Sequence, residues 1–146
     1  MLDNIFNRLH EKDKHMKLSD YSRNKFRATF VHWNVPSDFA EPFYNYLVHG
    51  FSPGSCFTAV LANDFISAMS RSHPANTVEA FKALVGWMRD SMPRSAYGSY
   101  EAIEAWQALT SDQRRAVLEQ HNLIFTAKEE TWMAIKGDPT FDPVLY

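Results

Sequence analysis

The fold is organised around residues 46–71, which read YLVHGFSPGSCFTAVLANDFISAMSR. Two segments with helical apolar spacing meet there at a tight turn, because Pro53 presets φ and Gly54 tolerates a positive φ. Gly50 stands where the end of the first helix needs a left-handed residue, and Ser55 is placed to cap the second helix. The apolar spacing predicts that this second helix continues unbroken to the end of the stretch.

The predicted second helix carries a polar pair, Asn63 and Asp64, inside an otherwise apolar segment. One interpretation is a polar site for a ligand or a partner. The other is a carboxylate that satisfies a nearby helix or turn, because buried polar groups usually bond to backbone. His73 and Asn76 follow at the next chain break, so a ligand- or partner-binding site around this turn would combine the four residues.

Cap signals divide the rest of the chain into short helices. A cap residue followed three positions later by Glu or Gln, the spacing of a capping box, occurs in several places. The expected caps are Asp38, Asn76, Thr110 and Thr126, with Ser99 as a further single cap. Gly86, inside an apolar stripe, indicates the close approach of a neighbouring helix. These signals predict an all-α protein, a compact orthogonal array of six or seven short helices.

Three regions are expected along the chain. Residues 1–35 form an N-terminal arm or helices that face a partner, residues 36–136 a helical domain, and residues 137–146 an extended tail. Within the first region, residues 28–33 are open to two interpretations. They continue a helix, or they form one short strand, because β-branched and aromatic residues dominate them.

The composition limits the classes of function. The formal net charge is -2, from 15 basic and 17 acidic side chains, which argues against a strongly basic nucleic-acid binder and against an acidic DNA mimic. The single cysteine excludes an intrachain disulfide and a cysteine-based metal site. We see no basic and apolar leader and no apolar run near the roughly 20 residues of a membrane span. We therefore expect a soluble protein of a reducing cytoplasm that is not secreted.

The reactive side chains form no recognisable catalytic set. Cys56 begins the second predicted helix, and His49 and His73 flank the segment, which is the pattern of a Cys–His nucleophile or of a small buried thiol beside a cap. The six histidines show no metal-ligand spacing. We predict no catalytic residues, no metal and no cofactor.

The most basic segment carries Arg23, Lys25 and Arg27, close in sequence to His32 and Trp33. These three cations are the candidates for contact with nucleic acid. The competing interpretation is a solvated charged face, which is the commoner role of a run of charges.

The central stretch also carries a resemblance. Residues 46–76 read YLVHGFSPGSCFTAVLANDFISAMSRSHPAN, and ALVGWMRDSMPRSAYGS follows downstream. These segments resemble small accessory proteins encoded by tailed bacteriophages, which carry a YLxxGxxPGSFxxAVLxND-type motif and a downstream tryptophan. The resemblance covers about residues 36–136 and implies a phage setting without an activity. Cys56 departs from the motif, which usually has an aromatic residue there, and this weakens the nucleophile interpretation.

We expect from these observations a non-enzymatic protein that binds a host or phage protein in the host cytoplasm, as a defence antagonist or host-takeover factor. The excess of aromatic residues, 14% of the chain, favours such a contact surface. The alternatives are a small-ligand or nucleotide-binding helical domain and an accessory nucleic-acid binder. The identity of the partner and the oligomeric state stay open.

Overall fold

The computed structural model describes residues 18–136. The described part of the chain is all-α, with eight α-helices and two short 3-10 helices. In chain order the elements are α2 (Leu18–His32), η1 (Ser37–Phe39), α3 (Ala40–His49), α4 (Ser55–Leu61), α5 (Phe65–Arg71), α6 (Val78–Ser91), η2 (Arg94–Ala96), α7 (Tyr100–Ala108), α8 (Ser111–Gln120) and α9 (Ala127–Lys136). The predicted all-α array is confirmed, with slightly more helices than the six or seven expected. The predicted tail, 137–146, and the first part of the predicted arm lie outside the described residues.

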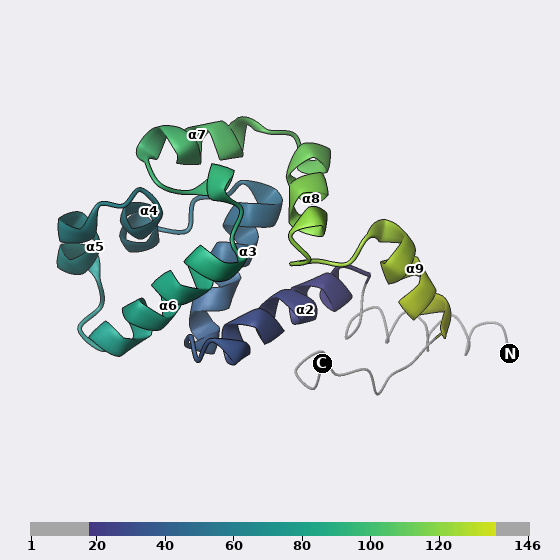
Figure 1. Ribbon diagram of the computed structural model, residues 1–146, viewed down its shortest axis with the longest axis horizontal. Coiled ribbons are helices and arrows are strands. Elements are labelled where there is room, and N and C mark those ends of the chain that lie inside the picture. Colours follow the sequence, from purple (N-terminus) through teal and green to yellow (C-terminus); the bar gives the residue numbers. More distant parts are fainter. Residues whose placement is uncertain (1–17, 137–146) are drawn as a thin grey trace, which may run out of the picture.

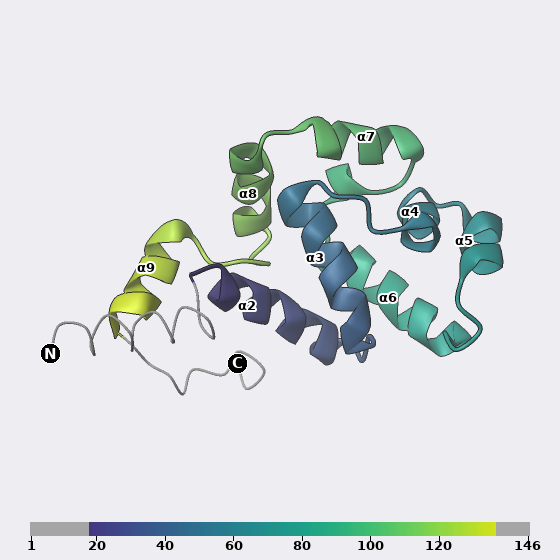
Figure 2. The same cartoon turned by 180° about the vertical axis from the view of Figure 1, so that it is seen from behind.

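Helices α2, α3 and α6 form the centre of the molecule, where α3 stands across the other two (Figure 1). Helix α2 contacts α3, α6 and α9, while α3 also contacts α7 and α8. The short pair α4 and α5 lies at one end of the molecule and α9 at the other, as both views show (Figures 1 and 2).

The core at this centre is aromatic. The ring of Trp87 lies among three buried phenylalanines, with centroid distances from 4.4 to 5.8 Å, to Phe26, Phe30 and Phe43. Each such side chain stabilises the fold by roughly 1.5–3 kcal/mol through removal of apolar surface from water. Two of the three come from α2, so residues 18–35 share one core with the rest of the described chain. The helical interpretation of the segment near residue 30 is the one that the structure has.

Several local predictions are confirmed by the hydrogen bonds. Gly50 ends α3 in the left-handed conformation, with φ 71°. Ser99 caps α7, accepting from the backbone N–H of Ala102. Thr110 forms a complete capping box with Gln113, and the side chain and backbone of Thr126 form the same pair of bonds with Glu129. The close approach at Gly86 is also present, because a Cβ there would lie 2.9 Å from the ring of Trp33.

The prediction of one helix from Ser55 to the end of the central stretch is wrong. The chain breaks after α4, and Asn63 adopts a left-handed conformation with φ 61°. Asp64 then caps α5, where its side chain accepts from the backbone N–H of Ser67 at 3.4 Å. Asparagine tolerates this conformation and aspartate is a strong N-cap, so the polar pair ends one helix and begins the next.

Three expected caps are also wrong. Gly54 precedes α4 without a side-chain cap, and Ser55 is already the first helical residue. Asp38 lies within a 3-10 turn before α3, where no side-chain cap is formed. Thr77 rather than Asn76 caps α6, accepting from Ala80 N–H at 3.1 Å.

Candidate functional site

The central stretch forms one wall of an apolar groove between α4–α5 and α6. The groove has a volume of about 370 Å³. We define the apolar groove by its large apolar side chains, Val60, Phe65, Met69, Val78, Phe81 and Val85. Asn63, Asp64 and Lys82 line it as well.

Three of the apolar side chains that line the groove are strongly exposed. Phe65 is 74% exposed, Val78 72% and Val85 54%. Ile66, which follows Phe65 in the sequence, is 80% exposed. Single exposed apolar residues are ordinary, but a contiguous group around a hollow marks a contact surface. The break of the predicted helix produces this surface, because α5 leaves the line of α4 at the turn that contains the polar pair.

Cations lie along the α6 side of the groove. Lys82 lines the groove itself, and Arg89 and Arg94 line a neighbouring hollow of about 290 Å³. The two hollows share Val60, Asn63 and Val85, so the apolar and basic surfaces are continuous. We call these three cations the basic rim. Among residues 18–136, no hydrogen bond or ion pair engages any of them.

The carboxylate in the groove already has partners. The Tyr100 hydroxyl donates to Asp64 Oδ2 at 2.7 Å, and this bond, with those from Ser67, holds the pKa of Asp64 below its ordinary value. The same bond raises the pKa of Tyr100. Asp64 therefore stays ionised and anchors the α4–α5 turn to α7, while the charges without partners around the groove are positive.

The structure divides the four predicted site residues into two pairs. Asn63 and Asp64 line the groove. His73 and Asn76 lie in the connection between α5 and α6 and are outside its lining. His73 has a local role there, since its Nδ1 accepts from the backbone N–H of Ala75 at 3.0 Å.

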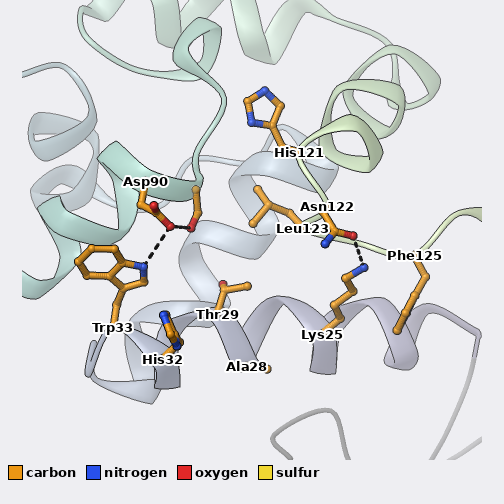
Figure 3. A pocket seen from close by; sticks show the side chains of 11 residues that line it. Lys25, Ala28, Thr29, His32, Trp33, Asp90, His121, Asn122, Leu123 and Phe125 are labelled. Atoms are coloured by element: carbon orange, nitrogen blue, oxygen red, sulfur yellow. Dashed lines mark hydrogen bonds between the residues drawn. The ribbon is translucent and has the colours of Figure 1, made fainter. Parts of the chain in front are cut away.

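A second hollow, the polar cleft, lies between α2 and the chain that follows α8 (Figure 3). Its volume is about 380 Å³. We define the polar cleft by the side chains that supply its polar groups and aromatic walls, Lys25, His32, Trp33, Asp90, His121, Asn122 and Phe125. The sequence did not place these residues together, because they come from three segments that lie far apart along the chain.

The three cations predicted for nucleic acid contact different parts of the protein. Arg23 and Arg27 flank Glu41 on α3, at 4.0 and 3.4 Å. Lys25 instead enters the polar cleft, where its Nζ donates to Asn122 Oδ1 at 2.6 Å. The three side chains thus lie in two separate environments on α2.

The thiol of Cys56 is partly buried and engaged by the backbone. Cys56 Sγ donates to the backbone carbonyl of Ala68 at 3.3 Å, and burial raises the pKa of the thiol. A raised pKa keeps the thiol protonated at neutral pH, whereas the nucleophile is the thiolate. This geometry matches the small buried thiol rather than the Cys–His interpretation.

Within residues 18–136, we find no group of three or more His, Cys, Asp or Glu side chains arranged to hold a metal ion. Nor does any helix in this part of the chain combine the length and apolar character needed to cross a membrane.

Comparisons with protein-family models, with curated proteins and with solved structures find no match for this chain.

No direct signal in the sequence indicated that the groove residues are exposed. Phe65 falls on the apolar stripe of the predicted long helix, and such positions normally face a core. The signal that was present is the Asn63-Asp64 pair itself, because both residues are poor helix formers and favour caps and turns. A break at this pair would have moved Phe65 off the stripe.

Proposed function

We propose that this protein is a non-enzymatic binding protein whose apolar groove takes an acidic amphipathic helix of a protein partner. The observation that carries the proposal is the continuity of exposed apolar side chains with the basic rim. In the phage setting that residues 46–76 suggest, the partner is a host or phage protein in the host cytoplasm, and the role is defence antagonism or host takeover.

The groove supports a helical occupant for reasons of shape and chemistry. A helix bound in a groove buries side chains at positions i, i+3, i+4 and i+7, and aromatic or aliphatic anchors supply most of the binding energy. Phe65, Val78 and Val85 are exposed and line the groove, so they contact such anchors directly.

The basic rim selects the charge of the occupant. Lys82, Val85 and Arg89 have i, i+3 and i+7 spacing, which places them on one face of α6. Carboxylates on the partner helix would therefore pair with Lys82 and Arg89 while its apolar side chains enter the groove. Complementary charge of this kind raises the association rate and sets the orientation of the complex.

The test is photo-crosslinking during infection. A photoreactive phenylalanine analogue replaces Val85, and the trapped peptide is identified by mass spectrometry after affinity capture. We expect a stoichiometric crosslink to a segment with helical apolar spacing and several carboxylates. In the double variant Phe65→Ser with Val85→Ser, recovery of the same partner should fall at least about tenfold, as for loss of a buried anchor.

The control variant is Trp132→Ser with Ile135→Ser, which removes two apolar side chains of similar exposure, 64% and 75%, from α9 at the other end of the molecule. It should leave recovery unchanged. The proposal fails if both double variants recover the partner equally. It also fails if the crosslink joins two copies of this chain, joins nucleic acid, or does not form.

A further inference from the structure

We propose that the polar cleft is a second binding site, for a small organic anion that carries a phosphate or carboxylate group on a planar body. The site lies on elements other than those of the apolar groove, so the inference does not depend on the proposed function.

The first observation concerns the surroundings of the Lys25 ammonium. The side chain is half-buried, and its Nζ lies 4.4 Å from the centre of the Phe125 ring and donates to the neutral amide oxygen of Asn122. Among residues 18–136, no carboxylate lies within ion-pairing distance of this ammonium. A partly desolvated cation without a direct ion pair is unfavourable for the fold, and an anionic ligand would compensate it.

The electrostatics agree with this reading. Burial lowers the pKa of Lys25, and the charge of Glu129 on α9 offsets only part of that effect. The ammonium has three N–H groups, of which Asn122 uses one, so two donors remain for a ligand.

The other polar groups of the cleft are mostly donors. His32 from the end of α2 and His121 from the end of α8 line it, and an imidazole offers an N–H in either protonation state. Asn122 is held in a left-handed conformation, φ 58°, and its Oδ1 already accepts from Lys25. Its amide nitrogen therefore remains as another donor (Figure 3).

The single carboxylate of the lining, Asp90, is already engaged. Its Oδ2 accepts from the indole N–H of Trp33 at 3.3 Å and from the Ser91 hydroxyl at 3.1 Å. These bonds hold the carboxylate at the α6 edge of the cleft, away from the Lys25 side (Figure 3). The positive and negative groups are thus separated, and an anion at Lys25 would not meet Asp90 directly.

The size and walls of the cleft indicate an organic ligand rather than a bare ion. Sites for small molecules usually enclose about 300–1,000 Å³, and the polar cleft has about 380 Å³. Trp33, Leu123 and Phe125 give it apolar walls. Such walls fit a flat ring, while Lys25 and the donors fit its acidic substituent.

The test uses two anions, each with an uncharged counterpart. Adenosine monophosphate is compared with adenosine, and benzoate with benzamide, by isothermal titration calorimetry and by amide chemical shifts of the full chain. We expect at least one anion to bind at millimolar concentration or below, with shifts at Lys25 and Asn122, and its uncharged counterpart to bind at least about tenfold more weakly.

Two charge-matched variants localise the site. Lys25→Met should weaken binding of that anion at least about tenfold, as for loss of a charge-assisted hydrogen bond. Lys128→Met removes the same charge from the exposed surface of α9, outside the lining of the cleft, and should leave anion binding unchanged. A thermal melt of each variant confirms that it is folded.

The inference is overturned if neither anion shifts the resonances of the cleft, if the uncharged counterparts bind equally well, or if Lys25→Met binds like the unmodified protein. None of these results changes the expected outcome of the crosslinking test at Val85. Either proposal can therefore fail while the other stands.

Discussion

Arg114 is buried and Lys25 is half-buried, and the two cations use their N–H groups differently. Arg114 is 5% exposed, and its guanidinium donates to the backbone carbonyls of Val48, Gln107 and Leu109. It thereby satisfies carbonyls at the ends of α3 and α7 and in the connection from α7 to α8. Lys25 donates to one neutral amide, and within residues 18–136 no acceptor engages its other two N–H groups. A buried cation with most of its N–H groups engaged stabilises the fold, whereas a cation with unused N–H groups in a cleft is suited to binding a ligand.

The largest expected effect comes from Arg114→Met, which keeps the apolar stem but leaves several carbonyls without a donor. Each orphaned buried carbonyl costs about 1–3 kcal/mol, so we expect the free energy of unfolding to fall by about 3 kcal/mol or more. Urea denaturation followed by circular dichroism measures this. A loss below about 1 kcal/mol would mean that water replaces the guanidinium and that the contrast with Lys25 is false.

Gly50→Ala should have the next largest effect. The φ of 71° disfavours any side chain, and a Cβ would lie 2.9 Å from Arg114 Nη1. We expect a loss of roughly 1–3 kcal/mol in the free energy of unfolding. In an Arg114→Met background the clash is absent, so the cost of the glycine change should shrink in a double-mutant cycle. Strictly additive costs would show that Arg114 is not held against Gly50.

Lys25→Met should have the smallest effect on stability. We expect the free energy of unfolding near neutral pH to stay within about 0.5 kcal/mol of the unmodified protein or to rise, because a desolvated ammonium is removed. Lys128→Met, on the exposed face of α9, is the charge-matched control. A loss above about 1 kcal/mol would make Lys25 a structural cation like Arg114.

The pH dependence of the free energy of unfolding also distinguishes Lys25→Met from Lys128→Met. The pKa of Lys25 is lower in the folded protein than its ordinary value of 10.5, so the unfolded chain binds more protons in the window just below that value. Lys25 therefore makes stability increase as the pH rises through this window. Lys25→Met should flatten that increase in urea titrations at successive pH values, and Lys128→Met should not.

Local structure was predictable wherever the deciding groups lie within one turn of each other. The caps at Ser99, Thr110 and Thr126 and the left-handed Gly50 are all of this kind. The wrong cap at Asn76 has a local alternative. A second cap residue, Thr77, stands one position later, and it is the one that accepts from the backbone of α6.

The candidate sites were predictable only in part. Asn63 and Asp64 do line the groove, although as the turn between two helices and not as a polar pair within one. His73 and Asn76 were grouped with them by proximity in sequence, which says little about the direction of a side chain after a chain break. The polar cleft could not be predicted, because His32 and His121 are brought to one hollow by the packing of α2 against the later helices.

The sequence by itself determined an all-α protein of short helices, several of their ends, and an aromatic core, because these depend on periodicity and on hydrogen bonds between near neighbours. The tertiary structure alone decided which apolar residues stay exposed and which cations lack partners. Both properties depend on the direction in which each helix leaves its turn. At Asn63 one left-handed residue sets that direction, and it separates an exposed groove from the buried stripe that the apolar spacing predicted.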